Sequence, residues 1–227
     1  MPEAEPDAFD PSELEHPSVT VDVIIFTVKD DDLKVLLVER DHDPFEGYWA
    51  LPGGFIDMEE SLETAAERVL EDKTGVTDVY LEQLYTFGDP DRDPRTRVIT
   101  VGYFALVHAD AVEIGEEERA AWHSAYDLPE LAFDHADILE YAVKRLRWKL
   151  EYTTAVFSLL PDRFTMSDLQ HAYEIVFDRE FDKRNFRKKI KKLDLVEYTG
   201  EKTEGVSHRP AKLYRPNRDV GEIVEIL

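Results

Sequence analysis

The chain has 227 residues, of which 43% are hydrophobic and 34% are charged, and its formal net charge is −23. This composition is typical of soluble globular proteins with one or two domains, each large enough to bury a core. No apolar run reaches the roughly 18–20 residues of a membrane span, and the N-terminal residues lack the apolar region of a signal peptide. The absence of cysteine excludes disulfides, thiol nucleophiles and Cys-ligated zinc, so we expect a cytoplasmic protein with no membrane partner.

The charge is unevenly distributed along the chain. Residues 1–150 contain 13 Lys and Arg against 36 Asp and Glu, whereas residues 151–227 contain 14 basic and 14 acidic residues. Within the second part, residues 183–218 contain 12 basic residues against 4 acidic ones. A basic block behind an acidic body indicates two domains with different partners, although a charge run can also be a solvated helix face. The acidic surplus fits either solubility or adaptation to high salt.

The first part of the chain alternates strands with helices. Residues 1–18 are rich in proline and acid, which predicts a disordered tail. Apolar β-branched runs, separated by an aspartate turn, then predict a hairpin over 19–28 and 33–38. Further strands are expected at 79–84, 98–107 and 123–126, and helices at 61–74 and from an N-cap at Asp134 to Leu150. This order predicts an α/β/α sandwich over residues 19–152.

The second part has a different pattern. A short helix ends at Pro161, and the capping-box spacing of Thr165 and Asp168 opens the next helix. Asp182 is placed to cap a basic helix over 183–193, which precedes a hairpin of 195–198 with 211–215. Helix, helix, basic helix and hairpin is the order of a winged helix-turn-helix. We therefore predict an α+β protein whose second domain covers residues 153–227.

The segment from Gly53 to Val76 contains a glycine turn, an acidic loop and a helix of good formers that ends at Gly75. It resembles the Nudix box, Gx5Ex7REUxEExGU with U aliphatic, through Gly54, Glu60, Arg68, Leu70, Gly75 and Val76. In the family, the three carboxylates of REUxEE gather the metal for diphosphate hydrolysis. The corresponding positions here are Val69, Asp72 and Lys73.

Those three positions predict loss of the metal site. They share one helix face, which now presents an apolar side chain, a shortened carboxylate and an ammonium group to a divalent cation. We therefore expect no catalytic residues and no cofactor, with Mg²⁺ required only if the protein is hydrolytic. The metal ligands would then be Glu60, Glu71 and Asp72.

The remaining charges of the box have two interpretations each. Lys73 either replaces the positive charge of the metal beside a ligand phosphate or is only a surface lysine. Arg68 is expected to support the preceding loop through an internal ion pair rather than to contact a ligand. Glu60 is either an ordinary loop acid or, as the resemblance implies, a secondary metal or structural partner.

The loop from Thr86 to Arg95 indicates the class of ligand. It resembles the FGDPxRDPR segment of Nudix proteins that handle ADP-ribose and related dinucleotides. Its arginines are planar forks suited to diphosphate or ribose oxygens, although an Arg/Asp/Pro loop is more often a salt-bridged turn. The candidate ligand-binding residues are Gly53, Gly54, Lys73, Arg92, Arg95 and Arg97.

The basic helix is a candidate DNA reader. Phe186 and Ile190 are predicted to face inward, which leaves the basic side chains outward and suited to the major groove. The hairpin would be a wing that contacts the DNA backbone or the minor groove. The candidate DNA-binding residues are Lys183, Arg184, Arg187, Lys188, Lys191, Arg209 and Lys212.

Residues 19–216 as a whole resemble Nudix-related transcriptional regulators of the NrtR type. The resemblance rests on the degenerate box, the RDPR loop and the segments FTMSDLQHAYE, DKRNFRKKI and RPAKLYR. It implies a homodimeric regulator that senses ADP-ribose or a related metabolite and binds a palindromic operator of NAD-metabolism genes. A sister group answers to a sugar such as arabinose, so the effector stays open. The alternatives are an active ADP-ribose hydrolase with a C-terminal extension, and an interaction protein that has lost both activities.

Overall fold

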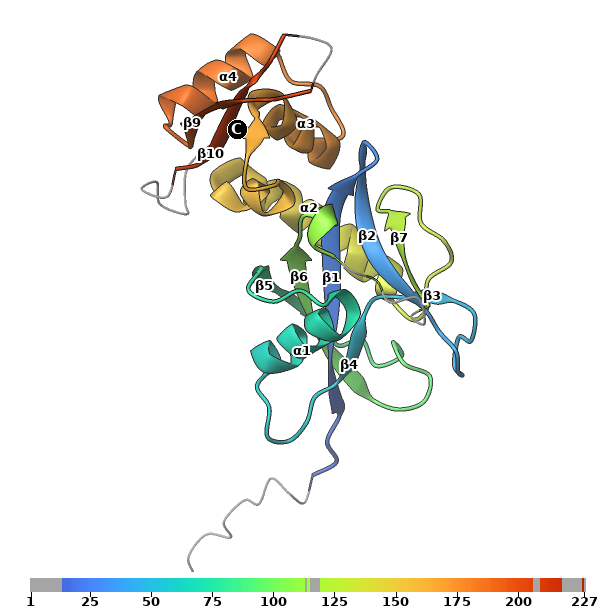
Figure 1. The fold of residues 1–227 in the computed structure, drawn as a ribbon. Coiled ribbons are helices and arrows are strands. Elements are labelled where there is room, and N and C mark those ends of the chain that lie inside the picture. The colour runs from blue at the N-terminus through green and yellow to red at the C-terminus, as the bar shows by residue number, and fades with distance from the viewer. Residues whose placement is uncertain (1–13, 113, 115–118, 206–208, 218–225, 227) are drawn as a thin grey trace, which may run out of the picture.

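The computed structural model describes residues 14–112, 114, 119–205, 209–217 and 226. It contains a sheet-based lobe and a smaller lobe of helices and a hairpin at one end of that sheet (Figure 1). Within the described residues, no helix combines the length and the apolar character that a membrane crossing requires. The predicted tail falls mostly on residues 1–13, which lie outside the described part, and Ser18 already begins the first strand.

The larger lobe is built on one mixed seven-stranded sheet. Its strands are β1 (Ser18–Lys29), β2 (Asp32–Glu39), β3 (Trp49–Ala50), β4 (Gly53–Phe55), β5 (Tyr80–Phe87), β6 (Val98–Leu106) and β7 (Ala120–Ser124). The main order is β3-β2-β1-β6-β5, with β4 on β1 and β7 on β2, and only β1 and β6 run parallel. Central β1 is buried without interruption from Val21 to Thr27, because both of its faces are covered by helices.

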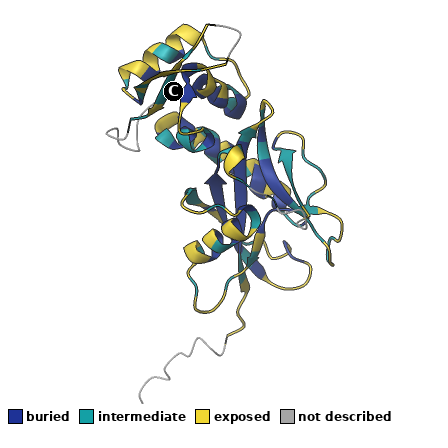
Figure 2. Cartoon of the chain, viewed as in Figure 1, coloured by how far each residue is buried: buried dark blue, intermediate teal, exposed yellow. Residues whose placement is uncertain are grey.

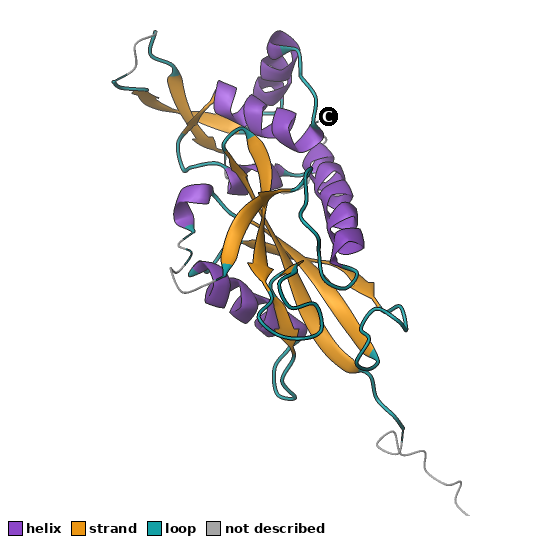
Figure 3. Ribbon diagram, turned by 90° about the vertical axis from the view of Figure 1, so that its right-hand side faces the viewer, coloured by secondary structure: helices purple, strands orange, loops and turns teal. Residues whose placement is uncertain are grey.

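One helix packs on each face of the sheet (Figure 3). α1 (Leu62–Thr74) packs its apolar side on one face together with Val21, Val23 and Ile25 of β1. α2 (His135–Tyr152) covers the other face, where Ile24 and Phe26 point. The alternating directions of β1 side chains therefore supply both cores, and the predicted sandwich is confirmed.

The smaller lobe is a winged helix, as predicted. It contains η3 (Thr154–Leu159), β8 (Phe164–Thr165), α3 (Met166–Phe177), α4 (Lys183–Lys192), β9 (Val196–Lys202) and β10 (Lys212–Pro216), and a further short turn, η2 (Ala109–Ala111), follows β6. Tyr173 and Phe186 belong to the same buried cluster as Ile24 of the sheet. The two lobes therefore share a continuous core. A division of the chain into domains after residue 152, where α2 ends, stays a prediction.

Two of the three predicted helix caps are confirmed. Thr165 and Asp168 form a reciprocal capping box at the start of α3, and Asp182 accepts a hydrogen bond from the backbone N–H of Asn185. Asp134 occupies the N-cap position of α2 but makes no capping hydrogen bond. Asp134 is therefore at the predicted N-cap position, but its carboxylate pairs with Arg92 instead of capping the helix backbone.

Some predicted boundaries also change. The glycine turn at Gly53 and Gly54 is in fact strand β4, which pairs antiparallel with β1. The strand predicted at 123–126 runs from Ala120 to Ser124, since its partner β2 extends the ladder toward the earlier residues. Longer pairing with β6 likewise carries β5 on to Phe87.

Candidate ligand pocket and nucleic-acid interface

A pocket of about 250 Å³ opens beside β4 in the larger lobe. β1 and β4 form its floor, and the loop after β5 and the segment before α2 form its sides. Its lining residues are Thr20, Asp22, Arg40, His42, Ala50, Leu51, Gly53, Gly54, Phe55, Arg92, Asp93, Arg95, Val98, Phe133 and His135. The tertiary structure thus brings together four of the six predicted ligand residues: Gly53, Gly54, Arg92 and Arg95.

Glycine at position 53 is required by the approach of β4 to β1. A β-carbon there would lie 2.2 Å from Asp22 Oδ1 and 2.7 Å from the Val21 carbonyl oxygen. Because such distances are far below van der Waals contact, any side chain would push β4 off the sheet. A β-carbon at Gly54 would meet open space, so Gly54 leaves room in the pocket.

A buried ionic network lies at the base of this pocket. Arg92 donates to both carboxylate oxygens of Asp134, at 2.8 and 2.6 Å, and its Nη2 lies 3.7 Å from Asp22 Oδ2. His135 Nδ1 accepts from the Leu51 N–H at 2.9 Å, which places the proton of a neutral ring on Nε2, 3.8 Å from Asp22. Burial lowers the pKa of His135, in agreement with the neutral form. The Arg92 side chain is therefore held in a fixed position, and its charge is balanced by Asp134 and Asp22.

The mouth of the pocket carries two further guanidinium groups on one aromatic ring. Arg40 and Arg95 lie 4.8 and 5.8 Å from the centre of the Phe133 ring. Arg95 hydrogen-bonds to Asp93 and holds the pKa of that carboxyl below its usual range, while burial and nearby Arg95 lower the pKa of Arg40. Pairing with Asp93 raises the pKa of Arg95. Two guanidinium groups at one opening, one of them beside an unfavourable neighbouring charge, form a site suited to oxyanions.

A second hollow, of about 700 Å³, adjoins the first and shares Arg92 and Phe133 with it. Its walls are aromatic and acidic, and its other lining residues are Phe45, Tyr85, Thr86, Phe87, Gly88, Asp89, Asp91, Pro94, Asp134 and Asp137. Aromatic faces can stack on a planar base, and carboxylates can accept hydrogen bonds from sugar hydroxyls. The two adjoining hollows together therefore present arginine side chains next to aromatic rings and carboxylates.

Helix α1 does not fit a metal ion. Val69 is only 4% exposed and packs in the core between α1 and the sheet. Arg68 donates to both carboxylate oxygens of Glu60, at 3.2 and 2.6 Å, which confirms the predicted ion pair and lowers the pKa of Glu60. Asp72 is left exposed in the third turn. In the part of the chain that the structure describes, no three His, Asp or Glu side chains group to hold a metal.

The other two predicted ligand residues lie outside the pocket lining. Lys73 is half-buried in the last turn of α1, and Arg97 is an exposed residue immediately before β6. Their proposed roles as ligand contacts stay predictions, and the geometry ranks Arg95 ahead of both.

The outer face of α4 is exposed and strongly basic (Figure 2). Phe186 and Ile190 are buried, as predicted, while Lys183, Arg184, Lys188 and Lys191 are exposed. Among the described residues, none of these four cations has a carboxylate within ion-pair distance. Their charge is therefore available to an external polyanion.

Arg187 and the wing complete this face. Arg187 is half-buried, and its Nη2 donates to Ser167 Oγ of α3 at 2.9 Å, so it joins two helices. On the hairpin, Lys212 lies 4.7 Å from the ring centre of Tyr198, which is 43% exposed. Arg209 is exposed and follows the undescribed residues 206–208.

Comparison with known proteins agrees with both lobes. The NUDIX domain model matches residues 17–142, and the NrtR DNA-binding winged helix domain model matches residues 156–215. The ADPR-responsive transcriptional repressor NtrR of Acinetobacter baylyi is 41% identical over 211 residues, which is 90% of this chain and 84% of the relative. The chain belongs to the NrtR family of Nudix-related regulators.

Two further matches extend the family assignment. The crystal structure of Shewanella oneidensis NrtR with a 27mer DNA is 39% identical, with a TM-score of 0.82 over 91% of this chain and 97% of that one. The ADP-ribose pyrophosphatase of Methanocaldococcus jannaschii is 37% identical over 135 residues, 59% of this chain and 76% of the relative. The match to the Shewanella structure spans both lobes. The match to the Methanocaldococcus enzyme covers a smaller part of the chain.

Sequence reasoning missed much of the NrtR-family pocket. Arg40, Phe133 and His135 line it, and Asp134 holds Arg92 in place, but none belongs to a motif. The sequence offered one signal, the consecutive residues Phe133, Asp134 and His135 at the start of a helix. The order of residues in the chain does not show that Asp134 pairs with Arg92.

Proposed function

We propose that this protein is a transcriptional repressor whose Nudix-like domain binds ADP-ribose without hydrolysing it. One observation carries the proposal: a cation-and-aromatic pocket and an unpaired basic recognition helix occur in a single chain. The names of the Acinetobacter and Methanocaldococcus relatives both specify ADP-ribose, although one relative is a repressor and the other an enzyme.

In this proposal the diphosphate lies at the mouth of the pocket, against Arg95 and Arg40. Its negative charge would offset the mutual repulsion of the two guanidinium groups. The adenine would stack among Tyr85, Phe87 and Phe133 in the adjoining hollow, where the carboxylates accept from ribose hydroxyls.

DNA is proposed to bind along α4, with Lys183 and Arg184 of its first turn nearest the bases and Lys188 and Lys191 on phosphates. The wing, with Lys212 and Arg209, would contact the flanking backbone. We further propose a cytoplasmic homodimer, because a two-fold protein matches a palindromic operator. ADP-ribose then acts by shifting the population between dimer geometries that fit and misfit the half-sites.

The second candidate function is ADP-ribose hydrolysis, favoured by the similarity to the Methanocaldococcus enzyme. Three features weigh against it: Val69 is in the core, Glu60 is occupied by Arg68, and Lys73 follows Asp72. We propose that no Mg²⁺ is needed. The purified protein with ADP-ribose and Mg²⁺ is expected to release no AMP above the level of a Glu60→Gln, Asp72→Asn variant. Turnover in the range of about 1 s⁻¹ or more would replace the repressor proposal with an enzyme.

The repressor proposal is tested with fluorescent duplexes from the upstream region of its own gene, by anisotropy at fixed salt. Binding is expected to be tighter than to a shuffled duplex of equal composition, and ADP-ribose is expected to weaken it. AMP with ribose 5-phosphate, which supplies the same parts unjoined, serves as the control. Equal affinity for both duplexes, or no response to ADP-ribose, would refute the proposal.

A further inference from the structure

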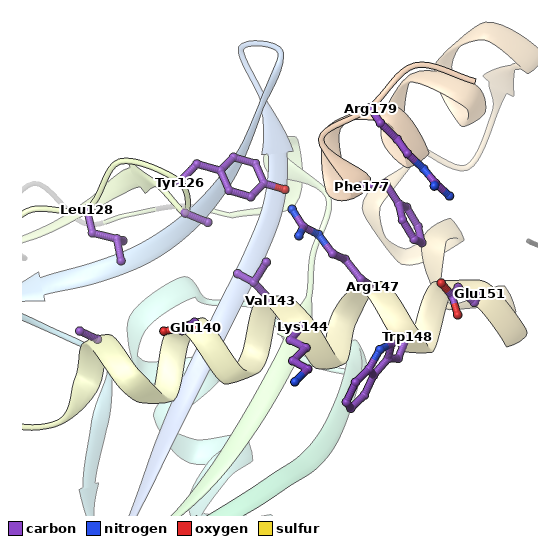
Figure 4. A pocket seen from close by; sticks show the side chains of 12 residues that line it. Tyr126, Leu128, Glu140, Val143, Lys144, Arg147, Trp148, Glu151, Phe177 and Arg179 are labelled. Atoms are coloured by element: carbon purple, nitrogen blue, oxygen red, sulfur yellow. The ribbon is translucent and has the colours of Figure 1, made fainter. Parts of the chain in front are cut away.

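A separate hollow of about 810 Å³ lies between the two lobes, along the exposed side of α2 (Figure 4). One side is the exposed side of α2 with the loop after β7, and the other is the end of α3 with the first residues after it. Its lining residues are Ala125, Tyr126, Leu128, Ala136, Glu140, Val143, Lys144, Arg147, Trp148, Glu151, Phe177 and Arg179. None of them lines either hollow of the ligand pocket.

Three cations in this hollow lie beside aromatic rings. Lys144 Nζ is 5.0 Å from the Trp148 ring centre, and the guanidinium carbons of Arg147 and Arg179 are 5.7 and 5.3 Å from those of Tyr126 and Phe177. Within the described chain, none of the three has a carboxylate within ion-pair distance.

The hollow also carries two acids, Glu140 and Glu151, but both are exposed. Arg147 is half-buried and rises from α2 toward the Tyr126 hydroxyl in Figure 4. One positive charge, that of Arg147, therefore lies deeper in the hollow than either carboxylate. Trp148 remains 42% exposed, so a large flat face is open beside that charge.

We propose that this hollow is a second effector site, which binds a small organic anion with a flat ring. The acid group would meet Arg147, Arg179 and Lys144, and the ring would lie against Trp148 and Phe177. Its volume is within the range of small-molecule sites, roughly 300–1,000 Å³. A ligand there contacts both lobes at once.

Phe177 connects this site to the recognition helix. Its ring centre is 5.9 Å from that of Phe181, which is 6.0 Å from Phe186 on the buried side of α4. Tyr173 contacts all three rings. Since packed rings cannot shift singly, a ligand that displaces Phe177 also moves the base of α4. The effect on DNA rests on the proposed function, whereas binding at the site does not.

The probe is 8-anilinonaphthalene-1-sulfonate, a fluorescent aromatic sulfonate, titrated into the full-length protein. The Lys144→Gln, Arg179→Gln variant removes two exposed cations and leaves the core intact. We expect its affinity for the probe to fall about fivefold or more, the loss of two partly exposed charge contacts. The matched control, Lys29→Gln with Arg119→Gln, removes two exposed cations elsewhere and is expected to bind as the parent does.

ADP-ribose provides the second arm, because it should not displace the probe from a separate site. In the third arm, saturating probe should change affinity for the upstream duplex in the parent and much less in the Lys144→Gln, Arg179→Gln variant. Equal probe binding by this variant and the control, or full displacement by ADP-ribose, overturns the site. Probe binding that leaves DNA affinity unchanged overturns the coupling. A protein that binds no specific DNA at all refutes the repressor proposal instead, and the first two arms still decide the site.

Discussion

Arg92 and Asp134 form a two-bonded ion pair that joins the loop after β5 to the N-cap position of α2. The Arg92 side chain is 4% exposed and that of Asp134 is 19% exposed, so water cannot replace a missing partner. Asp22, at 3.7 Å, is the only other carboxylate within ion-pair distance of Arg92 among the described residues. The pair thereby fixes the one arginine that both hollows of the ligand pocket share.

Replacing Asp134 by alanine should destabilise the fold by about 3 kcal/mol, because it leaves a buried guanidinium with one distant partner. Urea unfolding measures this loss of free energy. Asp137→Ala, on the exposed side of the same helix turn, is the matched control and should change stability by less than about 0.5 kcal/mol. Equal effects of the two changes would mean that the Arg92–Asp134 pair is not a stabilising contact.

ADP-ribose affinity should depend on Arg95 more than on Lys73. Arg95→Ala removes a guanidinium from the pocket mouth and should weaken binding about tenfold, the effect of one charge-assisted contact. Lys73→Ala should change it less than about threefold, since Lys73 is outside the lining. Calorimetric titration of both variants decides the order. A larger loss at Lys73 would restore it as the substitute for a metal charge.

The salt dependence of DNA binding should identify the contacting side of α4. Lys188→Ala should reduce the slope of log affinity against log salt by about 0.9, the value for one lost phosphate contact. Lys189→Ala is the control, because Lys189 is also exposed but lines a small hollow with Ile226. Its slope should match the parent. The reverse result would show that α4 presents a different side to DNA.

The junction of the lobes depends on the Tyr126 hydroxyl, which donates to the backbone oxygens of Ile175 and Val176 at 2.8 and 3.0 Å. Tyr126→Phe should cost about 1 kcal/mol of unfolding free energy, a typical value for a lost hydrogen bond. Tyr152→Phe removes another part-exposed tyrosine hydroxyl, one that makes no hydrogen bond to the described chain, and should be neutral. Thermal melts of the two variants distinguish these outcomes. If Tyr126→Phe leaves stability unchanged, the Tyr126 hydrogen bonds do not stabilise the junction of the lobes.

Acidification should destabilise the protein through His135. Burial lowers its pKa in the folded chain, so the unfolded chain takes up the proton first as the pH falls below about 6.5. Stability is therefore present above that pH and is lost below it, at no more than about 1.4 kcal/mol per pH unit for one proton. His135→Asn keeps an acceptor for the Leu51 N–H but cannot titrate. Its unfolding free energy should fall less between pH 7.5 and 5.5 than that of the parent, and parallel curves would contradict the assignment.

Local patterns accounted for most of the secondary structure and for the basic helix. Thr165 with Asp168 and Asp182 cap helices as their spacing predicts, because a cap contacts backbone only two or three residues away. The buried Phe186 and Ile190 follow equally from helical period. The short strands β3 and β4 were missed, since two or three residues carry no period and pair only when β1 and β2 are in place.

The sequence by itself determined that this chain carries a degenerate Nudix box, an RDPR loop and a basic winged helix, all of which are local spacings. Only the tertiary structure decided that Asp134 pairs with Arg92 and that Lys73 is outside the pocket lining. The physical reason is the separation along the chain between the residues that interact. Capping and amphipathic faces act over a few residues, whereas the Arg92–Asp134 pair spans 42 residues and forms only after the sheet brings its two loops together.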